Sequence, residues 1–398
     1  MQYKTWVSIN RKAITHNAKV LRSHIQKKTQ LWAVIKSNAY GHGLWHMAEA
    51  LDEIGVDPVR GRARAKGTSP QDRGAATSNG VDGYCVDSVI EGAKLRLGGI
   101  SKPILVLGPT FPNLLADAAA HNITLSISTM EALQELTKTI KDPAVRPSFH
   151  LKVDTGMNRQ GFYLKDLPRT LAYIKKHKLP ITGIFSHFAA AKDINYPTFS
   201  EQQNKQFLSA IALAKRAGFT NLTKHLAATA GTILSSKYHY DAVRCGIGLY
   251  GIYPSNELEA QLKREFPFQP ALSWYARISE VKHAPAGDFI GYDFTERLAK
   301  KTQIAIVPIG YWHGLSWSLS GQGTVLAGGK RCKILGRVSM DLIAIDTTGS
   351  KTKVGDPVVL IGTQGKETIT ARELARLTNT TPYEIVTRIN PLIHRTIS

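Results

Sequence analysis

Short apolar runs alternate with amphipathic segments over the first 250 residues. The runs cover residues 31–35, 83–86, 103–107, 123–127, 150–153, 181–186, 225–228 and 242–246, and most precede a helical pattern. Before the first run, Ile14, Ala18 and Leu21 recur at helical spacing behind Asn10, a favourable helix cap. Eight short strands that alternate with helices predict an α/β chain with a (β/α)8 TIM-like barrel.

The pattern changes near residue 254. Strand-like runs at residues 272–281, 302–308, 323–326, 332–338 and 357–362 are mostly separated by glycine-containing turns. One late helix is expected at residues 371–376, behind Thr370 as its cap. We therefore predict a barrel over residues 10–253 and a mainly β domain over residues 254–398. The first strand, residues 5–9, is compatible with either domain, and we assign residues 1–9 to the β domain.

Residues 58–82 do not fit the alternation. They carry no apolar period and are rich in glycine, alanine, arginine and serine. An echo brackets them, because the letters GVD occur at 55–57 and again at 80–82. Deleting the segment leaves a clean second barrel strand and its helix. The sequence thus predicts an inserted, mobile loop, whose basic side chains leave contact with an acidic partner open.

Composition narrows the class of protein. Hydrophobic residues make up 43% and charged residues 20% of the 398, which is typical of a globular protein. No apolar run is long enough to span a bilayer, and the N-terminal residues lack the apolar core of a signal peptide. Three scattered cysteines favour a reducing compartment, so we expect a cytoplasmic protein. The formal net charge of +21 is spread over surface segments, which argues against specific nucleic-acid binding.

Polar side chains gather where the predicted strands end. They are one amine, one phenol, two guanidiniums, two imidazoles and one hydroxyl: Lys36, Tyr40, Arg159, His187, His225, Thr229 and Arg244. The set contains no carboxylate cluster for a divalent metal, and the chain has no GxSxG nucleophile motif. It suits a phosphorylated aldehyde cofactor, because the lysine can form a Schiff base while hydroxyls and glycine amides hold the phosphate.

Seven motifs give the resemblance to a known family. In chain order they are AVIKSNAYGHG, LKVDTGMNRQGF, FSHFAAAKD, VRCGIGLYG, IGYDFTERL, VPIGYWHG and GRVSMDLIAID. Taken together they resemble the alanine racemase family, and the resemblance covers nearly the whole chain outside residues 58–82. It implies a pyridoxal-phosphate barrel followed by a β domain. The implied reaction is interconversion of L- and D-alanine, which supplies D-alanine for peptidoglycan.

The resemblance also assigns roles to individual residues. Lys36 resembles the Schiff-base lysine and one of two catalytic bases, and Arg244 the arginine that faces the pyridine nitrogen. His225 would orient that arginine. The phosphate of pyridoxal 5'-phosphate would be bound by Tyr40, Thr229, Tyr383 and the backbone of Gly246 and Ile247.

The remaining roles concern the substrate and the second base. Tyr292 resembles the second base, which the family supplies from the partner subunit of a homodimer, with His187 as its neighbour. Arg159 would bind the substrate carboxylate near the backbone of Met340, and Tyr311 would narrow the entrance. The resemblance also places Lys152 where some members carry a carbamylated lysine. No metal site is expected.

Departures from the family pattern leave alternatives open. Ala228 and Thr229 stand where the family usually has asparagine and serine, and GYWHG replaces the more usual GYADG. Trp312 and His313 therefore leave open a racemase of broader or different specificity, such as one for serine. A decarboxylase of basic amino acids, a pyridoxal-phosphate carrier and a cofactor-free scaffold are weaker alternatives. Such a decarboxylase brings an acid and a cysteine from its second domain, and no such motif is found in this chain. The carrier proteins resemble the barrel alone and lack the β domain that is expected here.

Overall fold

The computed structural model describes residues 3–53, 80–193, 195 and 197–398 and consists of two compact units. One unit, the barrel unit, comprises Lys12–Ser37 and Met47–Gln269. The other, the β unit, comprises Met1–Arg11, Asn38–His46 and Pro270–Ser398. The predicted inserted loop at residues 58–82 lies outside the described residues except for its last three.

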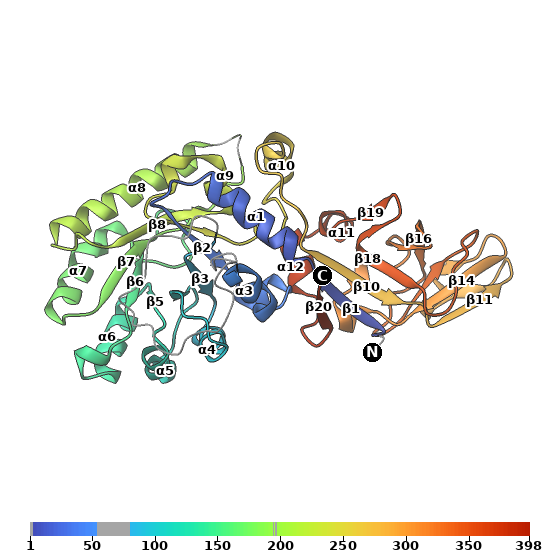
Figure 1. Ribbon diagram of the computed structural model, residues 1–398, viewed down its shortest axis with the longest axis horizontal. Helices are drawn as coiled ribbons and strands as arrows, with labels where there is room; N and C mark the ends of the chain where they lie inside the picture. Colours follow the sequence, from blue (N-terminus) through green and yellow to red (C-terminus); the bar gives the residue numbers. More distant parts are fainter. Residues whose placement is uncertain (1–2, 54–79, 194, 196) are drawn as a thin grey trace. The chain divides into compact units, whose positions relative to one another are not determined.

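The barrel unit is built on eight parallel strands (Figure 1). They are β2 (Gln30–Val34), β3 (Gly83–Val86), β4 (Ile104–Val106), β5 (Leu125–Ile127), β6 (Phe149–Lys152), β7 (Ile181–Phe185), β8 (Thr223–Ala228) and β9 (Ala242–Cys245). Their order is β4-β3-β2-β9-β8-β7-β6-β5. A parallel bridge between Leu105 and Thr124 joins the two end strands and closes the ring. The predicted (β/α)8 barrel is confirmed.

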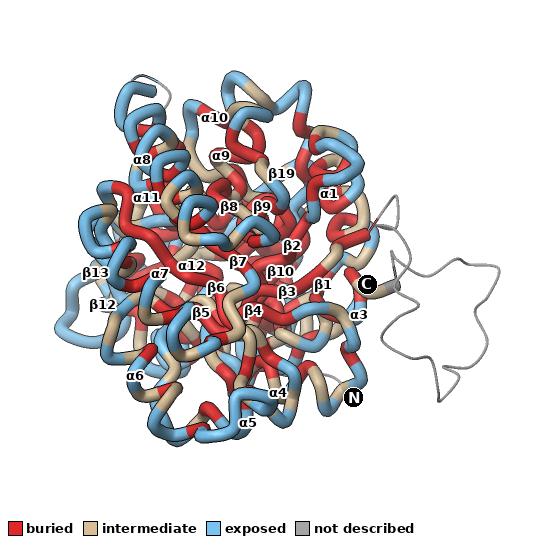
Figure 2. The backbone as a smooth tube through the Cα atoms, turned by 90° about the vertical axis from the view of Figure 1, so that its left-hand side faces the viewer, coloured by how far each residue is buried: buried red, intermediate tan, exposed pale blue. Residues whose placement is uncertain are grey.

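Helices follow most of the strands and enclose the barrel (Figure 2). Their bounds are α1 (Arg11–Ser23), α3 (Leu44–Glu53), α4 (Val89–Leu97), α5 (Leu115–Ala120), α6 (Met130–Thr139), α7 (Leu167–Lys176), α8 (Pro197–Arg216), α9 (Thr229–Leu234) and α10 (Asn256–Leu262). Helix α1 buries Ile14, Ala18 and Leu21, as the helical spacing predicts. Within the described residues, no helix has the length and apolar character to cross a membrane.

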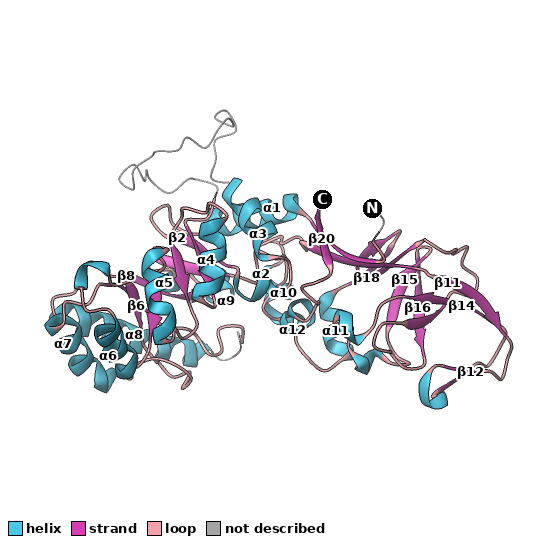
Figure 3. Cartoon of the chain, turned by 90° about the horizontal axis from the view of Figure 1, so that it is seen from below, coloured by secondary structure: helices cyan, strands magenta, loops and turns pink. Residues whose placement is uncertain are grey.

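The β unit contains a mostly antiparallel sheet of order β11-β14-β17-β16-β15-β18-β10-β1-β20, with β19 paired to β18 (Figure 3). The strands are β1 (Thr5–Ile9), β10 (Leu272–Arg277), β11 (Glu280–Ala284), β14 (Thr302–Val307), β15 (Thr324–Ala327), β16 (Lys330–Leu335), β17 (Ile343–Asp346), β18 (Pro357–Gln364), β19 (Glu367–Ile369) and β20 (His394–Ile397). The β unit also contains a two-stranded ribbon and two helices. The ribbon is formed by β12 (Phe289–Ile290) and β13 (Glu296–Arg297), and the helices are α11 (Ala371–Leu377) and α12 (Pro382–Thr387). Strand β1 pairs with β10 and β20.

Two details of this sheet differ from the expected pattern. The run at residues 272–281 forms two strands, because the chain leaves β18 after Arg277 and pairs with β14 from Glu280 onward. Strands β17, β19 and β20 were not expected. The late helix does begin behind Thr370, whose hydroxyl accepts a hydrogen bond from the Glu373 N–H at 3.1 Å.

A buried ion pair anchors the start of β2 in the barrel unit. Arg22 on α1 pairs with Asp82, and it also donates to the carbonyls of Thr29 (2.9 Å) and Gly80 (3.0 Å). The Asp82 carboxylate in turn accepts a hydrogen bond from the Leu31 N–H at 2.7 Å. Both side chains are nearly buried, so each charge depends on its partner.

We therefore expect Asp82→Asn to lower the free energy of unfolding by about 3 kcal/mol, because it leaves the buried Arg22 cation without a carboxylate. Urea denaturation followed by circular dichroism measures the change. The matched control is Glu135→Gln, which removes an exposed partner of Lys138 and should change stability by less than about 0.5 kcal/mol. Equal effects of the two substitutions would contradict the prediction.

Candidate functional site

The barrel places the predicted polar residues at one end. Lys36 follows β2, Lys152 ends β6, His187 comes shortly after β7, Thr229 follows β8 and Arg244 lies on β9. Because all these strands are parallel, their carboxyl ends open on the same face of the barrel. This face collects positive charge.

Arg244 is the most constrained of these residues. Its guanidinium is buried and donates to Nδ1 of His225, to the carbonyls of Ser186 (2.8 Å) and Leu226 (3.0 Å), and to Nδ1 of His187 (3.3 Å). In the part of the chain that the structure describes, no carboxylate lies within ion-pair distance of it. Burial lowers the pKa of Arg244 to about 10. A buried guanidinium held by neutral acceptors can face a further neutral acceptor, such as an unprotonated ring nitrogen.

A further histidine, His150 on β6, contacts His225. Nδ1 of His150 lies 2.7 Å from Nε2 of His225. Arg244 can only donate, so Nδ1 of His225 accepts, its Nε2 carries the proton, and Nδ1 of His150 accepts in turn. Burial, assisted by the Arg244 charge, lowers the pKa of His150 to about 3 and that of His225 well below its ordinary value. Both imidazoles are therefore neutral, and each has a fixed tautomer.

The chain from Val153 to Phe162 presents Arg159 through a carboxylate-bound loop. The Asp154 carboxylate accepts four backbone N–H bonds, from Gly156 (2.8 Å), Met157 (3.0 Å), Asn158 (3.1 Å) and Arg159 (3.1 Å). Four donors on one carboxylate fix the loop and satisfy its backbone. The loop therefore needs no regular secondary structure to hold Arg159 in place.

Lys152 precedes this loop and is buried. Its Nζ donates to Oε1 of Gln160 at 2.8 Å. Burial, together with the Arg159, Arg244 and Lys36 charges, lowers the pKa of Lys152 to about 8. A sizeable neutral fraction of the amine therefore exists near neutral pH, and this is the form that carbamylation requires. Carbamylation of Lys152 stays a prediction.

Lys36 begins a turn of unusual hand. It is the first residue of α2 (Lys36–Tyr40), and the four residues after it have φ between 51° and 55°. Such left-handed backbone costs non-glycine residues conformational energy, so other contacts must hold it. The carbonyl of Asn38 accepts from the Gly43 N–H (3.0 Å), and its side chain accepts from the Leu44 N–H (2.9 Å). These two bonds close the turn and lead into α3.

Asp87 is a neighbour of Lys36 that the sequence did not single out. Its Oδ1 lies 3.2 Å from Nζ of Lys36, and it follows β3 as Lys36 follows β2. The same strand-end reasoning that found Lys36 would have found it. His150 and Asp154 were also missed. Their signal was weaker, because a histidine inside a strand and an aspartate in a loop are usually structural.

The predicted phosphate ligands of the barrel unit form a tight cradle. The hydroxyl of Thr229 accepts hydrogen bonds from the N–H groups of Gly246 (3.1 Å) and Gly248 (3.4 Å). A Cβ atom at Gly248 would lie 2.7 Å from the Thr229 methyl group, so only glycine fits there. Ile247, between the two glycines, is buried. One hydroxyl and the amides of this turn have the donor chemistry that a phosphate needs.

Tyr40 and Tyr383 belong to the β unit, where their rings lie 6.0 Å apart. Burial raises the pKa of Tyr383 to about 12, so its hydroxyl stays protonated and can donate. A Cβ atom at Gly41 would lie 1.9 Å from the Val386 carbonyl, and Arg395 donates to the Gly41 carbonyl at 2.9 Å. These contacts fix the backbone that carries Tyr40.

The other predicted residues of the β unit are exposed. Tyr292, Tyr311 and Met340 are 69%, 46% and 53% accessible. The Tyr311 N–H donates to the Ser339 carbonyl at 3.0 Å, which holds the tyrosine beside the segment of Met340. They belong to a larger apolar set that also includes Phe289, Phe294, Trp312, Trp317 and Leu342. Phe289 and Phe294 are in contact, with ring centroids 5.4 Å apart, and contiguous accessible apolar side chains are typical of an interaction surface.

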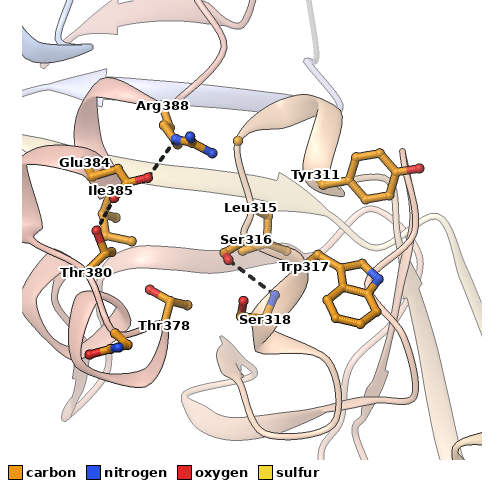
Figure 4. Close-up of a pocket in the computed structure, with 12 residues that line it drawn as sticks. Tyr311, Leu315, Ser316, Trp317, Ser318, Thr378, Thr380, Glu384, Ile385 and Arg388 are labelled. Atoms are coloured by element: carbon orange, nitrogen blue, oxygen red, sulfur yellow. Dashed lines mark hydrogen bonds and ion pairs between the residues drawn. The ribbon is translucent and has the colours of Figure 1, made fainter.

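A cavity of about 950 Å³ lies in the β unit beside Tyr311 (Figure 4). Tyr311 and Trp317 line one side, and Thr380, Glu384 and Arg388 line the other. Glu384 and Arg388 form an ion pair at 2.9 Å across one helical turn. The cavity therefore has an aromatic wall and a polar wall.

The neutral histidines behind Arg244 predict a pH dependence of stability. Their pKa values are lowered on folding, so below pH 6.5 the unfolded chain binds protons that the folded chain does not, and stability falls. Between pH 6.5 and about pH 5.5 each such histidine should cost about 1 kcal/mol. Urea titrations at several pH values should show that the free energy of unfolding falls less steeply with decreasing pH in His150→Gln than in the native protein. The control His283→Gln changes an exposed histidine of β11 and should keep the native pH dependence of stability. An equal pH dependence in the two variants would count against the neutral state of His150 and His225.

Comparisons with known proteins give the family. A model of the alanine racemase N-terminal domain matches residues 9–59 and 63–254, and a model of the C-terminal domain matches residues 271–397. Alanine racemase from Leptospira interrogans is 34% identical over 405 residues, covering 99% of this chain and 96% of that protein. Alanine racemase 2 from Bacillus subtilis is 35% identical over 398 residues, covering 98% and 94%.

Solved structures agree with the sequence comparisons. The crystal structure of alanine racemase from Bacillus anthracis with bound L-Ala-P matches with a TM-score of 0.89 and 32% identity, covering 100% of this chain and 96% of that one. The biosynthetic alanine racemase from Pseudomonas aeruginosa matches with a TM-score of 0.81 and 28% identity, covering 100% of both. Both domain models and full-length relatives above 30% identity agree, so the chain belongs to the alanine racemase family.

Proposed function

We propose that this protein is a pyridoxal-phosphate-dependent alanine racemase that interconverts L- and D-alanine. The observation that carries the proposal is the buried Arg244 with neutral histidines behind it, on the barrel face that also bears Lys36. When bound, pyridoxal phosphate supplies an aldehyde that bonds amino groups and a ring that withdraws electrons from the α-carbon. The residues of this chain then control where protons go.

Arg244 would determine how strongly the pyridoxal ring withdraws electrons from the α-carbon. Its guanidinium keeps its proton, so it can donate a hydrogen bond to the ring nitrogen without protonating it. Arg244 would thereby leave the ring a weaker acceptor of electrons, and negative charge at the α-carbon would be shorter-lived. Prompt return of a proton favours racemisation over side reactions such as transamination. His225 and His150 hold the guanidinium in place for this task.

Binding of the phosphate is assigned to Thr229 and to the backbone of Gly246 and Ile247, with Tyr40 and Tyr383 as further donors. The Thr229 hydroxyl and the turn that it contacts support this assignment. Arg159 binds the substrate carboxylate, because a guanidinium is the side chain best matched to a carboxylate. The Asp154 loop keeps Arg159 in one orientation before substrate arrives.

Racemisation requires two bases, because a proton leaves one face of the α-carbon and another arrives on the opposite face. Lys36 is one base. We assign the second to Tyr292 of a partner subunit, with His187 beside it and with Tyr311 and Met340 bordering the entrance. The accessible aromatic side chains of the β unit support a homodimer in which they are covered by a second copy of the chain.

The cellular role that fits this reaction is supply of D-alanine for peptidoglycan in the cytoplasm. Trp312 is 47% accessible near Tyr311, and a bulky side chain there favours a small substrate over a larger one. Alanine is therefore the preferred substrate, ahead of serine.

The first test combines a spectrum with a chiral assay. Native protein loaded with pyridoxal phosphate should show the visible absorbance of a lysine-bound cofactor, and it should racemise L-alanine faster than L-serine. Lys36→Ala should lose both the band and more than about 99% of activity, because the amine is both the point of attachment and a base. As control, Lys237→Ala removes an exposed lysine of the barrel unit and should keep both. Native racemisation by Lys36→Ala would overturn the assignment.

The second test asks whether each site uses two chains. Lys36→Ala and Tyr292→Phe are each expected to be nearly inactive. After dissociation, mixing in equal amounts and reassociation, half of the dimers carry one chain of each kind. One of their two sites then has both native bases, so roughly one quarter of native activity should return. If each chain completed its own site, mixing would restore nothing. Sedimentation of an active monomer would also contradict the shared site.

A further inference from the structure

The contact between Lys36 and Asp87 is not explained by the roles assigned so far. Nζ of Lys36 donates to Oδ1 of Asp87 at 3.2 Å, and the two side chains are 36% and 51% accessible. They come from the ends of neighbouring parallel strands, β2 and β3. The carboxylate therefore meets the amine at the face of the barrel where chemistry is expected.

The backbone around Asp87 is held from three sides. Its N–H donates to Oε2 of Glu91 at 2.9 Å, and its carbonyl accepts from the Gly108 N–H at 3.1 Å. The next residue, Ser88, caps α4 by accepting from the Glu91 N–H at 3.3 Å. A Cβ atom at Gly108 would lie 2.4 Å from the Asp87 carbonyl and 3.2 Å from its Oδ2. The glycine thus leaves room for the carboxylate, which is positioned before any ligand binds.

The surroundings make this carboxylate distinctive. The charges of Lys36, Arg159 and Arg244 all lie close enough to Lys152 to help lower its pKa. The nearby Asp154 carboxylate is occupied by four backbone N–H groups. In the barrel unit as described, Asp87 is the carboxylate that pairs with Lys36.

We propose that Asp87 is a positioning residue for Lys36 that stabilises its ammonium form, an inference that rests on the proposed function. In one direction the bond from the α-carbon to hydrogen breaks, the proton moves to Nζ of Lys36, and the electron pair stays with the substrate and cofactor. The Asp87 carboxylate offsets the charge that Nζ gains. In the other direction Nζ returns the proton to the same face. Asp87 itself takes up no proton.

The two enantiomers constrain how this role can be measured. L- and D-alanine have equal free energies, so the equilibrium constant is one and any substitution must change kcat/KM equally in both directions. The step at Lys36 is instead isolated by the isotope effect of a deuterium on the α-carbon. One enantiomer gives its α-hydrogen to Lys36 and the other gives it to Tyr292. Slowing only the Lys36 step raises the isotope effect for the first enantiomer and lowers it for the second.

Asp87→Asn is the informative variant, because it keeps the size and a hydrogen-bond acceptor but removes the charge. We expect kcat/KM to fall roughly 2- to 5-fold, as for a half-exposed ion pair. The isotope effects for the two enantiomers should move in opposite directions, and Asp87→Glu should partly restore both. Tyr292→Phe slows only the Tyr292 step, so the direction in which it displaces the two isotope effects identifies which enantiomer uses Lys36. Isotope effects that stay unchanged, or that move together, would overturn the proposal.

A second measurement needs no cofactor. Limited acetylation of the cofactor-free protein, read by peptide mass spectrometry, reports how readily each lysine acts as a neutral amine. Asp87→Asn should raise acetylation of Lys36 roughly 2- to 5-fold and leave Lys237 unchanged. The matched control is Glu201→Gln, which removes the carboxylate 3.0 Å from Lys237 and should raise Lys237 alone. An unchanged Lys36 in Asp87→Asn would overturn the pairing.

The two measurements separate the two hypotheses. If native protein neither racemises alanine nor binds pyridoxal phosphate through Lys36, the proposed function fails, whatever acetylation shows. If racemisation is present while both Asp87 readouts stay at their native values, only the role of Asp87 fails.

Discussion

The buried guanidinium of Arg244 is the constraint on which the rest of the site depends. A cation in the interior is tolerated only when its donors are satisfied, and here neutral groups satisfy them: His225, His187 and two backbone carbonyls. A carboxylate partner would have neutralised the positive charge that, under the proposed function, the cofactor ring nitrogen meets. Burial, assisted by repulsion from the Arg244 charge, keeps the imidazoles of His225 and His150 neutral.

Hydrogen bonds to the backbone likewise fix the other polar residues of the site in which Arg244 lies. Asp154 uses its whole carboxylate to fix the loop of Arg159, and Thr229 joins a turn in which only glycine fits at position 248. The left-handed turn after Lys36 is costly by itself and is held by bonds to Asn38. Polar groups that bind ligands are thus fixed by other polar groups before a ligand arrives, which lowers the cost of ordering them on binding.

Charge balance at this face explains why a carboxylate beside Lys36 matters. Lys152, Arg159 and Arg244 suit an anionic cofactor and substrate, and the charges of Arg159, Arg244 and Lys36 add to burial in lowering the pKa of Lys152. A base must accept a proton to do its work. Asp87 supplies an opposing charge at the one amine proposed to cycle between its two forms, while Lys152 keeps a lowered pKa and contacts the uncharged Gln160.

The sequence by itself determined the barrel, the mainly β second domain and the strand-end positions of Lys36, Thr229 and Arg244, because apolar periodicity and parallel strand order are local signals. It also led to the family, through seven motifs in order. Only the tertiary structure decided which groups touch: His150 behind His225, Asp87 against Lys36, and the partner change that splits residues 272–281 into two strands. These pairs are 75 and 51 residues apart along the chain. No local pattern encodes a contact between side chains that distant, because only the closed ring of strands brings them together.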